Sequence, residues 1–292
     1  DGSVLNYSHY HNYRRGLCMK KIENDECKKI MLDILKYFHK ICKENNINYT
    51  LIGGSLIGAI RHGGIIPWDD DVDVALLRTD YDKIIKVIEK DNNSNYKVIT
   101  WKNNDEYYYN FAKIVDKRTM LQEMNQKMYK DCGVYVDIFP YDIAPEKNIK
   151  LHHLRKKILN LFLHGLAFNK NDKSQRNYIL KKIRWVISYK IIGRKFLLSH
   201  YDKLCCKYNN TKGRYIMSPF VNKEPKLVLK SDFEKFINVK FDNVDVSIVK
   251  NYDSVLKVYF KDYMKLPPEN KRITHGLTAY WRDNDQINKN VN

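Results

Sequence analysis

The sequence predicts an α+β fold, because helical and strand periodicities alternate in its first half and helical periodicity dominates its middle. Apolar residues recur three and four positions apart in residues 24–45 and 81–91, as on a buried helix face. Residues 71–76 alternate acidic and apolar side chains, as a half-buried strand does. With 43% hydrophobic residues among 292, the chain is long enough and apolar enough to bury a core.

The first half supplies most of the predicted strands. In chain order we expect a helix over 24–45, a buried strand over 47–52, a turn over 53–55, a short helix over 56–61, a strand over 71–76, a helix over 81–91, and strands over 96–101, 107–115 and 133–139. Asn45 and Asn46 end the first helix, and Pro140 is expected to close the last strand, because proline cannot donate to a sheet.

The second half is mainly helical and then returns to short strands. Helical patterns cover 151–168 and 178–208, and the tail from Tyr215 carries strand-like runs and a helix over 247–260. The loop KLPPENKR follows near the end of the chain.

Most of the net charge of +18 comes from one block. Residues 147–214 hold 18 Lys and Arg against only Asp172 and Asp202, a formal charge of +16. Such a block implies an anionic partner: nucleic acid, an acidic membrane surface or a phosphate-rich polymer. We expect the apolar stripes of this region to pack on the core while the lysines face water; the alternative is an amphipathic face on an anionic membrane.

The cysteines indicate a reducing compartment. Cysteine occurs at six positions without C-x-x-C pairing or zinc-ligand spacing: Cys18, Cys27, Cys42, Cys132, Cys205 and Cys206. We expect reduced thiols rather than a structural metal. No apolar run is long enough to span a bilayer, and the first residues lack the pattern of a signal peptide. We therefore expect a cytoplasmic location; the alternative is a peripheral position on the cytosolic face of the membrane.

One short run combines glycines with acids. Residues 53–74, GGSLIGAIRHGGIIPWDDDVDV, hold five of the 12 glycines and four carboxylates. Period two places Asp71 and Asp73 on one strand face, and Asp137 comes from a later strand. Three such carboxylates suit a hard divalent cation, Mg²⁺ or Mn²⁺, that bridges to substrate phosphates. The acids are therefore predicted to hold a metal.

The glycine turn is predicted to hold phosphate. Gly53, Gly54 and Ser55 lead into a helix, so their backbone N–H groups and the serine hydroxyl suit an anion. Turn and acids together indicate phosphoryl transfer.

These motifs resemble those of a known protein family. The run at 53–74, with GVYVDIFPYD at 133–142 and YFKDYMKLPPENKR at 259–272, closely resembles the LicD/fukutin-type family of the nucleotidyltransferase superfamily. The resemblance is firm over about 25–145 and moderate over about 250–275, and the basic middle has no matching motif. It implies a nucleotidyltransferase-like core, a small mixed sheet flanked by helices, to which the basic helical region is added.

The composition of the first residues, the resemblance and the basic block together divide the chain. We expect a leader over 1–18 that is unstructured or foreign to the protein, a nucleotidyltransferase-like catalytic core over 19–150, a basic helical region over 151–214, and a segment over 215–292 that completes the catalytic unit.

Family membership implies transfer of phosphocholine, or a similar phospho-alcohol, from a CDP-activated donor to a sugar hydroxyl of teichoic acid or a lipopolysaccharide precursor, with release of CMP. Carried over, the metal ligands and catalytic acids are Asp71, Asp73 and Asp137, and Asp137 is also a candidate general base. The acceptor would be lipid-linked.

Several neighbours are open to two interpretations. Arg61 and His62 are placed to meet the donor diphosphate, although His62 is equally suited to capping a helix end. Lys113 is either a phosphate contact or a surface lysine. We expect Asp69 to orient a residue that binds the metal rather than to bind the metal itself. We expect Trp68 to act as a packing anchor.

Asp70 is expected to be solvated or structural, since it points away from the face of Asp71. The tyrosines, among them Tyr107, Tyr108, Tyr109 and Tyr135, are numerous enough for an aromatic cage around choline.

Three other functions use parts of the same evidence. A nucleotidyltransferase moving a nucleoside monophosphate to a small acceptor would use the same acids, but the long RH…IPW string argues against it. A D-x-D sugar transferase would carry its motif deeper in the chain. A basic module binding nucleic acid or membrane without catalysis leaves the acids without a role, and nucleic acid is an unlikely partner for them.

Overall fold

The structure, a computed structural model, describes residues 20–123, 127–170, 172–173, 175–272, 274 and 276–282. The predicted leader over 1–18 lies outside the described residues. The elements in chain order are β1 (Lys21–Ile22), α1 (Asn24–Glu44), β2 (Thr50–Leu51), α2 (Gly53–Ile57), the π-helix η1 (Gly58–His62), β3 (Asp73–Leu77), α3 (Arg78–Asp91), β4 (Tyr96–Ile99), β5 (Ala112–Asp116), β6 (Thr119–Glu123), β7 (Tyr135–Ile143), α4 (Ile149–Leu166), α5 (Tyr178–Trp185), the π-helix η2 (Val186–Ile192), α6 (Arg194–Cys206), β8 (Tyr215–Met217), β9 (Val228–Leu229), the 3₁₀-helix η3 (Lys230–Phe233), β10 (Phe236–Phe241), β11 (Val244–Val249), α7 (Tyr252–Tyr259), the 3₁₀-helix η4 (Glu269–Lys271) and β12 (Leu277–Trp281).

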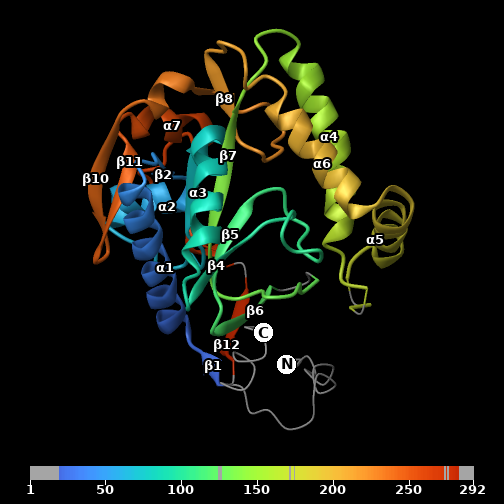
Figure 1. Ribbon diagram of the computed structural model, residues 1–292, viewed down its shortest axis with the longest axis horizontal. Helices are drawn as coiled ribbons and strands as arrows, with labels where there is room; N and C mark the ends of the chain where they lie inside the picture. Colours follow the sequence, from blue (N-terminus) through green and yellow to red (C-terminus); the bar gives the residue numbers. More distant parts are fainter. Residues whose placement is uncertain are drawn as a thin grey trace.

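A mixed sheet forms the centre, which confirms the predicted α+β class. Its strands run in the order β2-β3-β7-β5-β4; β3 and β7 are parallel and the other neighbours on this path are antiparallel. The long strand β7 crosses the middle of the molecule, with α1 and the β10–β11 hairpin on one side and α4, α5 and α6 on the other (Figure 1).

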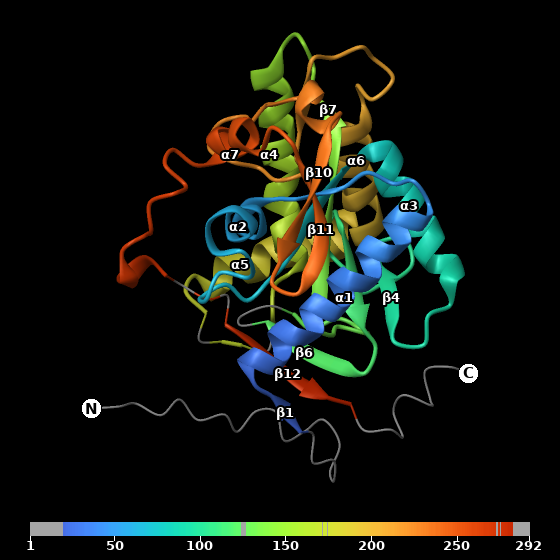
Figure 2. The same cartoon turned by 90° about the vertical axis from the view of Figure 1, so that its left-hand side faces the viewer.

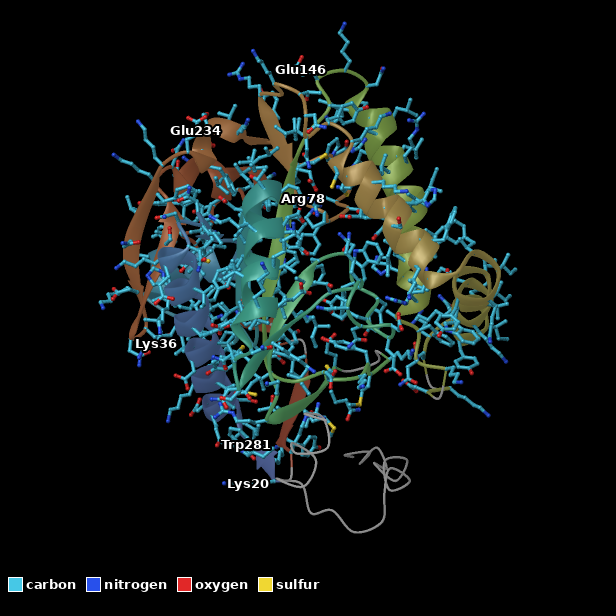
Figure 3. The ribbon with its side chains drawn as sticks, in the orientation of Figure 1. Lys20, Lys36, Arg78, Glu146, Glu234 and Trp281 are labelled. Carbon is cyan, nitrogen blue, oxygen red and sulfur yellow. The ribbon has the colours of Figure 1, made fainter. Side chains whose placement is uncertain are left out.

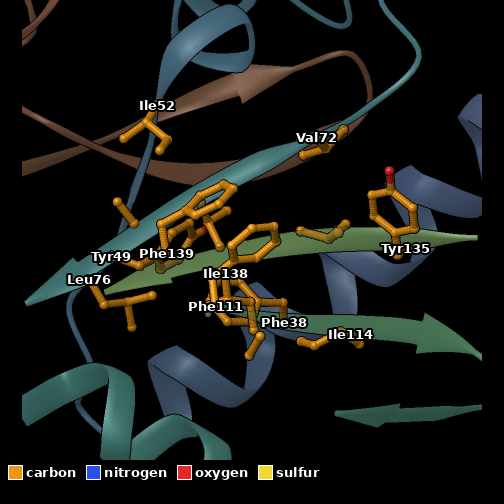
Figure 4. Packing of buried hydrophobic residues seen from close by; sticks show 14 of the residues in the cluster. Phe38, Tyr49, Ile52, Val72, Leu76, Phe111, Ile114, Tyr135, Ile138 and Phe139 are labelled. Atoms are coloured by element: carbon orange, nitrogen blue, oxygen red, sulfur yellow. The ribbon is translucent and has the colours of Figure 1, made fainter. Parts of the chain in front are cut away.

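The core is built where β3, β5 and β7 meet α1. Phe38 of α1, Leu76 of β3 and Ile138 of β7 are fully buried, and the ring centres of Phe111 and Phe139 lie 4.4 Å apart with the rings tilted by 50° (Figure 4). Burying each such side chain stabilises the fold by about 1.5–3 kcal/mol relative to leaving it exposed. The face of β7 opposite Ile138 carries Asp137, so the core fixes the strand that presents the acid.

Two predicted boundaries are wrong because neighbouring strands decide them. β7 does not close at Pro140 but continues to Ile143. Pro140 lies after Ile138, the last residue paired with β5, and before Asp142, the first paired with β8, so its missing N–H breaks neither ladder. The predicted turn over 53–55 is itself the first turn of α2.

The predicted helix over 247–260 is also wrong at its start. Residues 244–249 form β11, which pairs with β10, and the helix α7 begins at Tyr252. Strand β6 was not predicted, because its sequence does not alternate apolar and polar residues. It pairs with β12, near the end of the described chain.

The helices of the basic region join the core through buried arginines. Gly193, at φ +94°, ends the η2 helix, and Arg194 then donates to the carbonyls of Trp101 and Tyr107. Arg78, labelled near the middle of Figure 3, donates to Asp142 of β7 and Asp202 of α6. These bonds hold α6 against the sheet.

The apolar stripes of this region do not all pack on the core, which corrects the expected arrangement. α6 buries Leu197 and Leu198, and α4 buries Leu163 and Leu166, but α5 has no buried residue. The first turns of α4 instead bury His152, His153 and Lys156, with apolar side chains turned outward. Among the described residues, no helix combines the length and hydrophobicity that crossing a bilayer requires.

Candidate active site

Asp73 and Asp137 lie directly beside each other at the centre of the sheet. They are register partners on the parallel strands β3 and β7, and strand spacing places such partners about 4.8 Å apart. The Asp137 N–H donates to the carbonyl of Val72 at 2.9 Å, which extends the pairing one residue before β3 begins. Acids 64 residues apart in the chain are thus brought together by one parallel pairing.

The charges of these acids act on one another. The pKa of Asp73 is raised well above its ordinary value, first by burial and then by the carboxylates of Asp71 and Asp137. Burial likewise raises the pKa of Asp137, against the opposing effect of Lys113. Three negative charges in one partly buried place are unfavourable unless cations balance them. The structure therefore holds an acidic site that favours a cationic partner.

The glycine turn packs directly on these acids. Gly53 has φ +57°, which favours glycine, and a Cβ there would lie 3.5 Å from Oδ2 of Asp73. A Cβ on Gly54 would collide with the carboxylate of Asp69. The Asp73 N–H donates to the hydroxyl oxygen of Ser55 at 2.9 Å. The first turn of α2 and the acids are thus parts of one site.

Lys113 is not a surface lysine. Its side chain is 2% exposed, and Nζ lies 2.7 Å from Oδ1 of Asp137 and 3.8 Å from Glu123. The ammonium also lies 3.2 Å from the centre of the Tyr135 ring and 4.9 Å from that of Tyr109. The aromatic cage suggested by the tyrosines therefore surrounds a lysine of the protein itself.

Glu123 is a site residue that the sequence did not reveal. It ends β6, its side chain is 10% exposed, and it accepts a hydrogen bond from the Tyr109 hydroxyl at 2.6 Å. It thus supplies Lys113 with a second carboxylate. Its only sequence signal was an acid within TMLQE, a run too short to be recognised as a strand.

Arg61 contacts the C-terminal segment, and His62 lies beside Trp68. Nη1 of Arg61 donates to the carbonyls of Tyr263 and Lys265, at 2.5 and 3.2 Å. The exposed ring of His62 lies edge-on to Trp68 at 5.8 Å, and the guanidinium of Arg272 lies 4.7 Å from the Trp68 ring. Trp68 packs against the core as a partly buried anchor, as predicted.

The β10–β11 hairpin contacts the loop between η1 and β3. Its turn residue Asp242 accepts a hydrogen bond from Ile65 N–H and donates its own N–H to the carbonyl of Gly63. A Cβ on Gly64 would collide with the Asp242 carboxylate. Figure 2 shows this hairpin beside α2. The loop between the glycine turn and the acids is therefore fixed by residues almost 200 positions later.

Strand register brings two carboxylates together that could serve Mg²⁺, those of Asp73 and Asp137. Across the described residues, no three His, Cys, Asp or Glu side chains are arranged to hold a metal ion by themselves. Mg²⁺ usually takes one or two protein carboxylates, together with waters and substrate phosphates. The paired acids Asp73 and Asp137, whose pKa values burial raises, meet that requirement. Asp71 stays a predicted ligand.

A cavity of about 220 Å³ lies between α1, the loop before β3 and residues 274 and 276–277, and its lining does not include Asp71, Asp73 or Asp137. Acidic side chains line it, namely those of Asp25, Asp69 and Asp70, together with the rings of Trp68 and Tyr135. Lys28 also lines it and donates to the Pro67 carbonyl at 2.8 Å. Asp70, expected to be solvated or structural, thus borders a cavity.

Comparisons with known proteins agree with these motifs. Residues 46–172 match a family described as LicD/FKTN/FKRP, nucleotidyltransferase domain. The chain is 30% identical over 264 residues to the lipopolysaccharide cholinephosphotransferase LicD of Haemophilus influenzae, a match that covers 89% of this chain and 98% of that protein. It is also 41% identical over 54 residues to the ribitol 5-phosphate transferase FKRP of Homo sapiens, covering 18% and 11% of the two chains.

Proposed function

The chain belongs to the LicD/FKTN/FKRP family, and from this premise we propose that it transfers a phospho-alcohol, phosphocholine, from CDP-choline to a sugar hydroxyl of a cell-surface glycan. The acceptor is a lipid-linked precursor of lipopolysaccharide or teichoic acid, met on the cytosolic side of the membrane. CMP is the leaving group. The coarse activity, a phosphotransferase, follows from the relatives; the donor and the acceptor are our proposal.

One observation carries the proposal: Asp73 and Asp137 are register partners against the glycine turn. A diphosphate needs N–H donors and cations, and its attack by a hydroxyl needs an acid–base group close to phosphorus. In this proposal the backbone N–H groups of the glycine turn bind a phosphate, and Ser55 fixes the strand that carries Asp73.

We assign Asp71, Asp73 and Asp137 to holding Mg²⁺, for which Mn²⁺ can substitute. When bound, the ion neutralises phosphate oxygens and the departing CMP. Asp137 is the candidate general base, because burial raises its pKa toward the range in which a carboxylate accepts a proton. Lys113 opposes that shift. The lysine thus tunes the site rather than binding donor phosphate.

The C-terminal segment belongs to the same catalytic unit in this proposal. Arg61 and Ile65 are bonded to Tyr263, Lys265 and Asp242, so the donor loop is held by that segment. We keep a donor-phosphate contact for His62, whose exposed ring lies beside Trp68.

The cavity lined by Asp25, Asp69 and Asp70 favours a cationic alcohol as the group that is transferred. Choline carries a quaternary ammonium, which aromatic faces and carboxylates attract. Trp68, Tyr135 and three carboxylates line the cavity, whereas a neutral polyol such as ribitol gains nothing from that charge. This favours choline over ribitol.

The deciding experiment supplies CDP-choline, CDP-ribitol or CTP with Mg²⁺ and a lipopolysaccharide acceptor, and identifies the products. We expect CMP and a phosphocholine-modified glycan from CDP-choline alone. Release of pyrophosphate from CTP, with CMP joined to the acceptor, would establish the nucleotidyltransferase alternative. Absence of any turnover with every donor would refute both.

A further inference from the structure

The first turns of helix α4 expose apolar side chains and bury polar ones. Leu151, Leu154, Ile158 and Leu161 follow one face at spacings of three and four, and each is 47–52% exposed. The opposite face buries His152, His153 and Lys156. A helix in contact with water alone would place these groups the other way round. The exposed stripe therefore calls for a partner.

The next helical segments continue the exposed apolar surface. Ile179, Leu180 and Ile183 of α5 and Ile191 of η2 are 72%, 66%, 51% and 73% exposed. These segments pack on α4 where Gly165 approaches Ser188 and Arg184 so closely that a Cβ would collide. We call the exposed apolar residues of α4, α5 and η2 the α4–η2 surface. In Figure 1 its helices lie at the edge of the molecule away from the β10–β11 hairpin.

The charge beside this surface has one sign. Neither 149–166 nor 178–192 contains an acid. Exposed cations accompany the apolar residues: Lys150, Arg155, Lys170, Lys173, Arg176, Lys182 and Lys190. Leucine and isoleucine next to lysine and arginine are what a helix presents when it lies in the interface of an anionic bilayer. Nucleic acid would match the charge but leave the aliphatic residues in water.

We propose that the α4–η2 surface docks the protein on an anionic lipid bilayer, with the apolar side chains entering the interface and the cations meeting lipid phosphates. This docking does not depend on the reaction proposed above. It would bring the active site to an acceptor carried by lipid.

Vesicle co-sedimentation of the full chain tests the proposal, with vesicles of phosphatidylcholine alone or mixed with phosphatidylglycerol. We expect binding to the mixed vesicles that salt weakens. The pairs Leu154→Ser with Ile158→Ser, and Ile179→Ser with Ile183→Ser, should each weaken binding at least about 10-fold, because they remove the inserted groups. Lys182→Gln with Lys190→Gln should weaken it about as much.

Matched controls separate docking from general attraction. Met264→Ser with Leu266→Ser removes apolar groups that are 54% and 50% exposed outside the α4–η2 surface, and Lys36→Gln with Lys40→Gln removes two cations from α1. Both controls should bind like the wild type. Three results would overturn the proposal: no binding at low salt, equal losses in surface and control pairs, or binding that ignores the apolar pairs while heparin competes fully. The last would indicate a soluble polyanion.

Discussion

The candidate active site and the α4–η2 surface differ in the burial and pairing of their charged groups. At the active site, charged groups are buried and paired: Lys113 is 2% exposed, between Asp137 and Glu123. On the α4–η2 surface, aliphatic side chains such as Ile191 face water, and α4, α5 and η2 contain no acid. Buried, opposed charges suit chemistry on a small ligand, whereas exposed apolar and cationic groups suit contact with something large. The following substitutions test that contrast.

The largest effect is expected from Asp73→Asn and Asp137→Asn. Each should lower kcat by about 10³-fold or more, because each removes a charge that faces the reacting phosphate. Asp73→Asn should unfold no earlier than the wild type, because its neighbours already disfavour the ionised form. Turnover and thermal unfolding of the same preparations check this. Asp137→Asn should still bind donor; a near-normal rate would place the base elsewhere.

The next effect concerns the buried pair of Lys113 and Asp137. Lys113→Met should lower the free energy of unfolding by about 3–5 kcal/mol, because Asp137 is left among carboxylates without its cation. Adding Asp137→Asn to that variant should restore most of the loss, since both charges are then gone. Urea unfolding of the two single variants and the double variant measures the coupling. Additive losses would contradict the pairing.

Substitutions of two glycines with similar φ angles can separate backbone strain from an effect on the candidate site. Gly53→Ala and Gly63→Ala both place alanine at positive φ, +57° and +73°, so each should cost about 1–2 kcal/mol of stability. Only the methyl group at residue 53 lies against Asp73. We expect kcat/KM to fall about 10-fold further for Gly53→Ala than for Gly63→Ala. Equal losses would make the turn merely structural.

Acid should loosen the basic region through His152. Burial and the charges of Lys156, Lys207, His153 and Arg155 lower the pKa of His152 from 6.5 to about 4. Between these pH values the unfolded chain binds a proton that the folded chain refuses, so stability falls as the pH falls through this window. His152→Gln should remove about 1–2 kcal/mol of that dependence, as followed by thermal unfolding at pH 7 and pH 4.5. An unchanged slope would contradict it.

The smallest effect is expected from the α4–η2 surface. Leu154→Ser should change the free energy of unfolding by less than about 0.5 kcal/mol, because the side chain is already half exposed. Leu163→Ala, on the buried side of the same helix, should cost about 2–5 kcal/mol. Comparable losses would mean that the surface is part of the core.

The sequence predicted the elements that carry strong local signals. The helix over 24–45 and the acid-bearing strands were recognised because periodicity and motif agreed, and the parallel pairing of Asp73 with Asp137 confirmed that two segments meet. The glycine motif also placed the turn beside the acids.

The rest depends on contacts between distant segments. Nothing near Pro140 indicates that β5 ends before it, and nothing near Arg61 indicates that its partners are Tyr263 and Lys265. Likewise, helical periodicity locates the apolar stripe of α4 but does not specify which face meets the core. There, Lys156 reaches inward to donate to the Ser218 carbonyl, and the leucines are left outside.

The rate of CMP release from CDP-choline with a lipopolysaccharide acceptor, followed as free Mg²⁺ is varied, examines the acid pair most directly. Our account predicts no release in EDTA, saturable recovery when Mg²⁺ is restored, and no recovery for Asp73→Asn. An equal rate in EDTA and in Mg²⁺ would contradict it.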